Sequence, residues 1–200
     1  MSNKLNIAIM AGGNSSEEGI SLKTAAQIAK WLSKEKYHVF TILVKGTQWT
    51  LKHPVRGDIP VSWDTFSAIV DGKEINLQYA VIAIHGTPGE NGLLQSYFEM
   101  KGIPYNTCGV MSSAITFDKE MSKRLVSDLN INVAKGITIK KGQPVDSKAI
   151  VDRLGLPLFV KPNESGSSYG ITMVKTIKAL EDAIAKAYDC LLYTSDAADE

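Results

Sequence analysis

The N-terminal part of the chain contains a strand, a helix and a second strand in close succession, and this order constrains the fold more than any other feature. Leu5–Met10 and His38–Val44 are apolar runs typical of buried strands. Between them, Ser21 is a suitable N-cap for a helix with an apolar stripe of Leu22, Ala25, Ala29 and Leu32. Strands joined in this way form a parallel sheet with a right-handed crossover, and ligands bind beyond the carboxyl ends of such strands. We therefore predict an α/β protein with a ligand site at those ends, where Gly12 and His85 lie.

Further along the chain, the apolar patterns predict short strands and helices. The expected strands are 81–85, 102–105, 134–139, 158–160 and 171–174, and the expected helices are 91–100, 118–129, 147–154 and 180–187. Residues 45–73 show no clear period, which predicts an irregular excursion or a short hairpin in which Trp49 and Trp63 serve packing. We expect a domain boundary near Pro104–Thr116, with a parallel-sheet domain over 1–104 and an α+β domain over 105–189.

The composition excludes several classes of partner. With 22 basic and 21 acidic residues and no basic cluster, the chain lacks the charge pattern of a nucleic-acid-binding protein. No apolar run is long enough to span a bilayer, and the first residues show no signal-peptide pattern. The two cysteines lack the number and spacing of a zinc site or a disulfide framework. We expect a cytoplasmic protein that binds a small molecule, with no nucleic-acid or membrane partner.

A lysine followed by a small-residue loop stands at the end of the short apolar strand 158–160. Lys161 supplies a positive charge, Gly166 permits close backbone approach, and the hydroxyls of Ser167 and Ser168 can donate to phosphate oxygens. The lysine precedes the glycine, so this is neither a Walker A loop nor a dinucleotide-binding motif. The pattern indicates a polyphosphate site, and the alternative interpretation is a surface hairpin with a solvated Lys161.

Four segments, taken together, resemble the motifs of one enzyme family. They are 10–21 with its paired glycines Gly12 and Gly13, 81–92 around His85, 117–123, and 158–171. In this order and spacing they are similar to the motifs of the D-alanine:D-alanine ligases, which are ATP-grasp enzymes. The resemblance implies a parallel-sheet pre-ATP-grasp domain that binds the first D-alanine, followed by an incomplete ATP-grasp domain. It also implies an ATP- and Mg²⁺-dependent reaction that forms D-alanyl-D-alanine for peptidoglycan through an acyl phosphate.

The resemblance assigns the phosphate contacts to residues of the second half. Lys119 and Lys161 would contact the ATP phosphates, and the loop containing Gly166, Ser167 and Ser168 would close over them. The hydroxyl of Ser167 would also belong to the catalytic hydrogen-bonded set. Considered without the other motifs, Lys119 is more simply interpreted as part of a solvated helix face.

The resemblance places the amino-acid contacts in the first half. Glu17 would bind the ammonium group of the first D-alanine and act in the catalytic set, and the Ile20 amide and His85 would complete the pocket. Glu90 would order the loop that follows His85. The alternatives are that Glu17 is an ordinary acid near a helix N-terminus, as Glu18 would be, and that His85 is a neutral core histidine bonded to a backbone carbonyl.

The last residues differ from the rest. Residues 190–200 do not continue the preceding helical pattern and resemble translated adapter sequence, so we expect them to be non-native. The resemblance places the Mg²⁺ ligands, a charge-stabilising arginine and the second-substrate loop beyond residue 200, so no metal ligand is expected in this chain. We expect an N-terminal fragment without ligase activity, from a protein that is a homodimer at full length. Alternatives are another ATP-grasp carboxylate-amine ligase, such as a D-alanine:D-lactate ligase, or a non-catalytic nucleotide-binding module.

Overall fold

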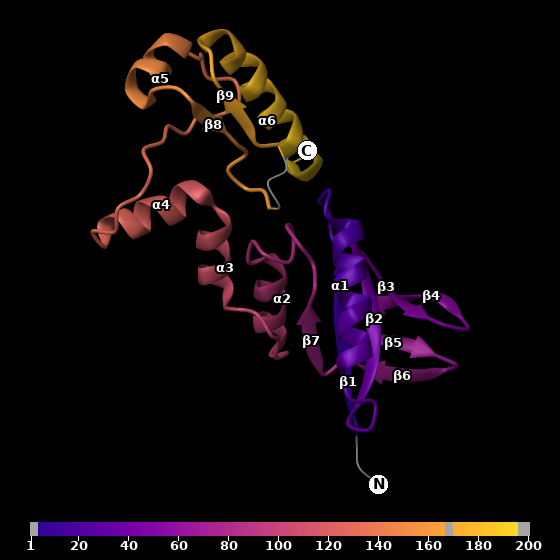
Figure 1. Cartoon of the computed structure of the whole chain (residues 1–200). Helices are drawn as coiled ribbons and strands as arrows, with labels where there is room; N and C mark the ends of the chain where they lie inside the picture. Colours follow the sequence, from indigo (N-terminus) through magenta and orange to yellow (C-terminus); the bar gives the residue numbers. More distant parts are fainter. Residues whose placement is uncertain (1–3, 167–169, 196–200) are drawn as a thin grey trace. The chain divides into compact units, whose positions relative to one another are not determined.

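The protein consists of two compact units, and the chain passes from the first to the second after residue 114 (Figure 1). The structure, a computed structural model, describes residues 4–166 and 170–195, and describes the side chains of the last helix as far as residue 190. Unit 1 comprises Met1–Ala114 and unit 2 comprises Ile115–Glu200. The break lies inside the segment in which the sequence indicates a boundary. Within the two described ranges, no helix has the length and apolar character needed to cross a bilayer.

Unit 1 is built on a seven-stranded sheet in the order β6-β5-β4-β3-β2-β1-β7. Strand β1 (Leu5–Gly12) pairs in parallel with both β2 (Tyr37–Lys45) and β7 (Tyr79–Ile82). Helix α1 (Glu18–Trp31) makes the crossover between β1 and β2. The predicted α/β class, with a parallel sheet at the N-terminus, is confirmed.

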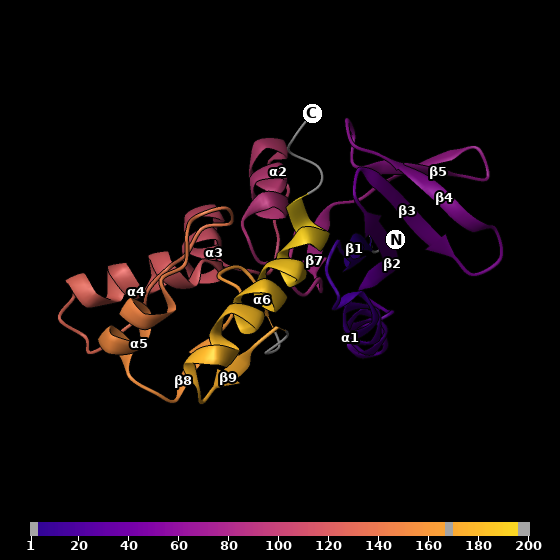
Figure 2. The same ribbon diagram turned by 90° about the horizontal axis from the view of Figure 1, so that it is seen from above.

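The central strand β1 is buried on both faces. Ala8 and Met10 pack into the cluster that contains Phe98 of α2 (Leu93–Lys101), whereas Ile9 packs with Ala25 of α1. Figure 2 shows α1 and α2 on opposite sides of β1. A parallel strand covered by helices on both faces must be apolar at successive positions, which is why Leu5–Met10 has a continuous apolar core and not an alternating pattern.

The prediction of an irregular excursion or short hairpin for 45–73 is wrong, because this part of the chain forms an antiparallel meander. Its four strands are β3 (Gln48–His53), β4 (Gly57–Ser62), β5 (Ser67–Val70) and β6 (Lys73–Asn76). The strands are short and β4 contains Pro60, which has no amide to donate to the ladder, so no period is visible in the sequence. Trp49 is 4% exposed and its ring centroid lies 4.6 Å from that of Trp63, which is the predicted packing role.

Ser21 does not cap α1, contrary to the sequence-based prediction. The helix begins at Glu18, and Ser21 lies inside it, fully buried. Its hydroxyl accepts a hydrogen bond from the Gly12 amide at 2.9 Å and donates one to the Ala83 carbonyl at 2.9 Å. The β1–β7 register ends at Met10–Ile82, so this hydroxyl joins the two strands just beyond the ladder.

Two further predictions near the unit boundary need correction. The expected strand 102–105 is reduced to a single parallel bridge between Tyr105 and Ala80. Helix α3 (Val110–Phe117) was not expected, and its run of apolar and small residues gave no clear helical stripe.

Unit 2 packs two helices against a short hairpin. Its elements are α4 (Lys119–Asp128), α5 (Ser147–Leu154), β8 (Leu158–Val160), β9 (Thr172–Val174), the 3₁₀ turn η1 (Ile177–Ala179) and α6 (Leu180–Ser195). The core joins α5, the antiparallel β8–β9 pair and α6 through Ile150, Leu158, Val174, Leu180 and Ile184. Helix α6 runs through residue 190, where a non-native tail is expected to begin; residues 196–200 lie outside the described residues.

The predicted strand 134–139 is wrong. These described residues adopt no regular secondary structure, although Ile137 and Ile139 pack against the unit 2 core. A strand needs a neighbour for its backbone groups, and within the described residues β8 and β9 pair only with each other. Apolar alternation therefore marked two half-buried isoleucines in an irregular segment and not a sheet strand.

We expect Ser21→Ala to lower the free energy of unfolding of unit 1 by about 1–3 kcal/mol, because it leaves the Gly12 amide and the Ala83 carbonyl buried without their shared partner. All three tryptophans lie in unit 1, so urea unfolding followed by tryptophan fluorescence reports on this unit. The exposed Ser16→Ala is the control and should change the free energy by less than about 0.5 kcal/mol. Equal effects of the two substitutions would contradict the bridging role.

Candidate functional site

The carboxyl ends of β1 and β7 bring two loops of unit 1 together. After β1, the Gly13 amide donates to the Val44 carbonyl at 2.9 Å and the Asn14 amide donates to the Thr87 carbonyl at 2.9 Å. A Cβ at Gly13 would lie 2.6 Å from Cγ2 of Ile84, and Gly13 has a φ of +100°. Glycine is therefore required where the loop after β1 touches the loop after β7.

Ser15 links the two residues that the sequence places in the amino-acid pocket. Its hydroxyl donates to the His85 carbonyl at 2.9 Å and accepts from the Glu17 amide at 3.2 Å. Glu17 is only 6% exposed and immediately precedes α1. Glu17 and His85, far apart in sequence, are thus held at one place by a serine that the sequence reasoning did not single out.

His85 is half-buried, and its surroundings hold both its backbone and its ring. Its Nε2 lies 3.1 Å from the hydroxyl of Thr24 on α1. The next amide, that of Gly86, donates to Oε2 of Glu90 at 2.7 Å, so Glu90 orders this loop as predicted. Gly86 has a φ of +75°, and a Cβ there would lie 3.0 Å from the side chain of Ser15 and 3.6 Å from Oε2 of Glu17.

Ile20 lies in the first turn of α1. Its side chain is 48% exposed, and its amide donates to the Glu17 carbonyl at 2.9 Å. The amide that was expected to complete the pocket is therefore already engaged inside the helix. The structure brings Glu17, His85 and Ile20 to the same end of the sheet, with Ser15 and Thr24 as supporting groups.

The candidate phosphate site of unit 2 begins at the N-terminus of α4. Asp118 caps this helix by accepting from the Met121 amide at 2.8 Å. Nζ of Lys119 donates to the carbonyls of Asn163 at 2.9 Å and Ser165 at 2.6 Å. The Glu120 amide donates to Oδ1 of Asn163 at 2.9 Å. An ammonium group has three donors, and Lys119 uses two of them to fasten the lysine-glycine loop.

The electrostatics of this region favour an anion. Burial lowers the pKa of Lys119, and the positive charge of Lys161 lowers it further, while Asp118 and Glu164 act in the opposite direction. Burial by itself raises the pKa of Asp118, but hydrogen bonds from the Met121 amide and the Asn163 side chain, with the charge of Lys119, bring it below its usual value. The two lysine ammonium groups therefore repel each other, and a bound anion would relieve that repulsion.

Lys161 follows β8 and is exposed, and Gly166 is half-buried in the loop beyond it. Ser167 and Ser168, which were predicted to contact ATP, lie outside the described residues. The loop returns at Gly170, which has a φ of +74°, and a Cβ there would lie 2.7 Å from Sγ of Cys190 on α6. Glycine is required at this position so that the end of the loop can pack against the helix.

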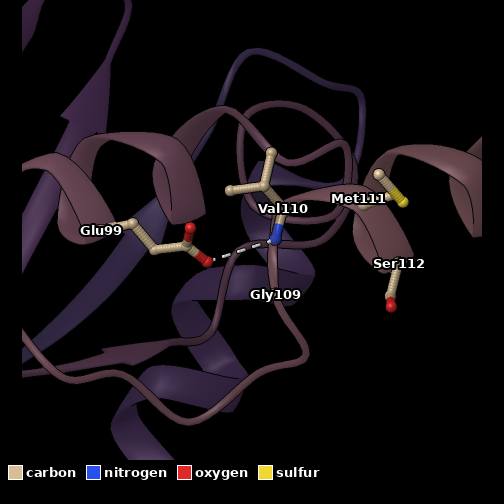
Figure 3. Close-up of a pocket in the computed structure, with 5 residues that line it drawn as sticks. All are labelled: Glu99, Gly109, Val110, Met111 and Ser112. Atoms are coloured by element: carbon tan, nitrogen blue, oxygen red, sulfur yellow. Dashed lines mark hydrogen bonds between the residues drawn. The ribbon is translucent and has the colours of Figure 1, made fainter.

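A surface hollow lies elsewhere in unit 1, lined by Glu99, Gly109, Val110, Met111 and Ser112 (Figure 3). Glu99 accepts a hydrogen bond from the Tyr105 hydroxyl at 2.6 Å and one from the Val110 amide at 3.4 Å, the latter drawn in Figure 3. The bond to Glu99, with a smaller effect of burial, raises the pKa of Tyr105 to about 12. Glu99 thus anchors the chain before α3, and none of the predicted site residues lines this hollow.

The described residues do not supply a metal centre. Among them, no three His, Cys, Asp or Glu side chains are grouped so that they could hold a metal ion.

These features define an α/β protein in which Glu17 and His85 lie at the strand ends of unit 1, and Lys119 of unit 2 is bonded to the loop that follows Lys161. A family model described as D-ala D-ala ligase N-terminus matches residues 6–108, and one described as D-ala D-ala ligase C-terminus matches residues 125–191. The chain belongs to the D-alanine–D-alanine ligase family.

Curated relatives agree with this assignment. A D-alanine–D-alanine ligase of Parabacteroides distasonis is 44% identical over 185 residues, which are 92% of this chain and 56% of the relative. A D-alanine–D-alanine ligase of Bacteroides fragilis is 41% identical over 92% of this chain and 57% of the relative. The chain therefore spans little more than half the length of these curated relatives.

Solved structures give the same result. D-alanyl-alanine synthetase A from Vibrio cholerae has a TM-score of 0.82 and 30% identity, covering 94% of this chain and 58% of that one. The VanG D-Ala:D-Ser ligase from Enterococcus faecalis has a TM-score of 0.76 and 28% identity, covering 94% of this chain and 60% of that one. The Bacillus anthracis D-alanine–D-alanine ligase complexed with ATP has a TM-score of 0.70 and 27% identity, with coverages of 92% and 55%.

We expect Gly86→Ala to destabilise unit 1 more than Gly72→Ala does. Both glycines have nearly the same φ, +75° and +74°, so an alanine costs about 1–2 kcal/mol at either position through backbone strain. Only at Gly86 does the added Cβ press on Ser15, whereas nothing lies within 4 Å at Gly72. Urea unfolding followed by tryptophan fluorescence should show an additional loss of about 1–3 kcal/mol for Gly86→Ala. Equal losses would show that the contact between Gly86 and Ser15 is not tight.

Proposed function

We propose that the full-length protein is a D-alanine–D-alanine ligase that joins two D-alanines with ATP for peptidoglycan synthesis. The observation that carries this proposal is the buried Glu17, whose backbone amide is linked through the Ser15 hydroxyl to the His85 carbonyl in a chain that belongs to this family. The proposal includes a cytoplasmic location and a homodimer.

The first step assigned to unit 1 is binding of D-alanine. The carboxylate of Glu17 pairs with the ammonium group of the amino acid, an interaction that is strong because Glu17 is largely shielded from water. His85 and the first turn of α1 around Ile20 complete the pocket. Glycine at positions 13 and 86 allows the two loops to approach closely enough to form it.

The step assigned to unit 2 is binding of the ATP phosphates. Lys161 and the remaining donor of Lys119 neutralise phosphate charge, and the loop with Gly166, Ser167 and Ser168 closes over the nucleotide. Support comes from the mutual repulsion of the two lysines and from the ligase of Bacillus anthracis, a structural relative complexed with ATP. Phosphoryl transfer depends mainly on positioning and charge neutralisation, which these groups can provide.

The reaction proceeds in two bond exchanges. A carboxylate oxygen of the first D-alanine attacks the γ-phosphorus of ATP, and ADP leaves. The amine of the second D-alanine then attacks the acyl carbon, and phosphate leaves with the oxygen that it took from the carboxylate. Glu17 and Ser167 are proposed to belong to the hydrogen-bonded set that orients the second substrate. Magnesium would assist charge neutralisation, but the described residues offer no ligand set for it, so no step is assigned to it.

The second substrate defines the alternative within this family. One structural relative, with 28% identity, is a D-Ala:D-Ser ligase. The groups around Glu17 and Lys161 are therefore compatible with a second substrate other than D-alanine. A D-alanine:D-lactate ligase is a further variant of the same chemistry. Product analysis with D-alanine, D-serine and D-lactate as acceptors distinguishes the three.

The role of Glu17 can be tested in a completed enzyme, in which residues 1–188 continue into the remaining segment of the Parabacteroides distasonis relative. Glu17→Gln should raise KM for the first D-alanine roughly 10- to 100-fold, because it removes the charge that pairs with the ammonium group. KM for ATP should change less than about twofold, since Glu17 is assigned only to the amino-acid site.

Glu18→Gln is the matched control, because Glu18 is the neighbouring acid in the first turn of α1. It should leave both constants unchanged if the role of Glu17 is to bind substrate, and it should resemble Glu17→Gln if both acids only favour the helix N-terminus. Similar increases in KM for ATP and D-alanine would remove Glu17 from the pocket.

A further inference from the structure

Thr24 is in a position to control the proton on the ring of His85. The backbone of His85 is already fixed, because its carbonyl accepts from Ser15 and the following amide donates to Glu90. Among the described residues the ring has one hydrogen-bond partner, the Thr24 hydroxyl, which lies 3.1 Å from Nε2. Thr24 is half-buried on α1, which begins at Glu18.

A neutral imidazole has one donor and one acceptor, and a hydroxyl has one proton. A helical threonine often donates that proton to the carbonyl four residues earlier. Within residues 4–166 and 170–190, the Thr24 hydroxyl has no partner besides Nε2, and Nδ1 of His85 has none. The proton of Thr24 is therefore available to the ring.

The two possible arrangements leave different numbers of unsatisfied groups. If Nε2–H donates to Thr24, the hydroxyl proton lacks an acceptor and the Nδ1 lone pair lacks a donor among the described residues. If Thr24 donates to Nε2, only one group remains, the Nδ1–H donor. Half-buried polar groups without partners are unfavourable, so the second arrangement is preferred.

We propose that Thr24 is a positioning residue that keeps His85 in the Nδ1–H tautomer and so leaves Nδ1–H as a donor for the carboxylate of the bound amino acid. The carboxylate contact rests on the proposed function. In that function Glu17 binds the ammonium group of the amino acid, and His85 binds the carboxylate of the same molecule. The opposite tautomer would present a lone pair, which repels a carboxylate.

The test is the tautomer of each histidine in the 200-residue chain, measured by long-range ¹H–¹⁵N NMR at a pH near 9, where an ordinary imidazole is neutral. The chain has three histidines. His53 is an internal reference, because its Nδ1 accepts from the amides of Val55 at 3.3 Å and Arg56 at 3.0 Å and must therefore be Nε2–H. His38 is an exposed reference.

The expected result is the Nδ1–H tautomer at His85 in the wild type and in Thr24→Ser, which keeps the hydroxyl. Thr24→Val keeps the shape of the side chain but removes the hydroxyl, and should abolish the preference for one tautomer at His85. An unchanged His53 signal shows that unit 1 remains folded. Nε2–H at His85 in the wild type, or an unaltered Nδ1–H in Thr24→Val, would overturn the role of Thr24.

Titration of the same three proteins with D-alanine separates this inference from the proposed function. Binding should shift the His85 ring signals in the wild type and Thr24→Ser, and should be about 2- to 10-fold weaker in Thr24→Val, as expected for one neutral hydrogen bond. Absence of binding to the wild type would contradict the proposed function and the carboxylate contact, whereas the tautomer measurement alone decides the role of Thr24.

Discussion

Two serine hydroxyls hold the carboxyl ends of β1 and β7 together, and the candidate amino-acid site depends on that junction. Ser21 joins the Gly12 amide to the Ala83 carbonyl just beyond the strand ladder. Ser15 then joins the Glu17 amide to the His85 carbonyl. The bond from the Asn14 amide to the Thr87 carbonyl adds a backbone link between the same two loops, so side-chain and backbone contacts together fix their positions.

At the candidate anion site of unit 2, two opposing effects act on Lys119. Burying a lysine near a second lysine disfavours the charged form of Lys119, yet two loop carbonyls accept hydrogen bonds from its ammonium group. The same contacts tie the loop after Lys161 to the start of α4. The ammonium group of Lys119 therefore orders this loop. Acidic groups among the described residues neutralise its positive charge only in part, and a bound phosphate would neutralise the rest.

The sequence predicted those parts of the fold in which local pattern and tertiary structure agree. The boundaries of α5 and β8 coincide with the predicted 147–154 and 158–160, since each has an apolar face bounded by turn residues. The meander of 45–73 was missed because its strands are short and show no clear period. A β strand was wrongly placed at 134–139 because alternation does not reveal whether a pairing partner exists. Ser21 has the chemistry of an N-cap, and only the tertiary structure shows that β1 and β7 use its hydroxyl instead.

The sequence indicates which residues belong to the candidate site, but it does not show the hydrogen bonds that connect them. Lys161 stands out because it follows a strand end, and the family resemblance singled out Glu17, His85 and Lys119. Ser15, Thr24 and Asn163 give no signal until the loops are folded. The central claim is that ATP activates the D-alanine carboxylate as an acyl phosphate. The most direct test supplies the completed enzyme with D-alanine labelled with ¹⁸O in its carboxylate. Released phosphate that contains one ¹⁸O for each dipeptide formed would agree with this account, and unlabelled phosphate would contradict it.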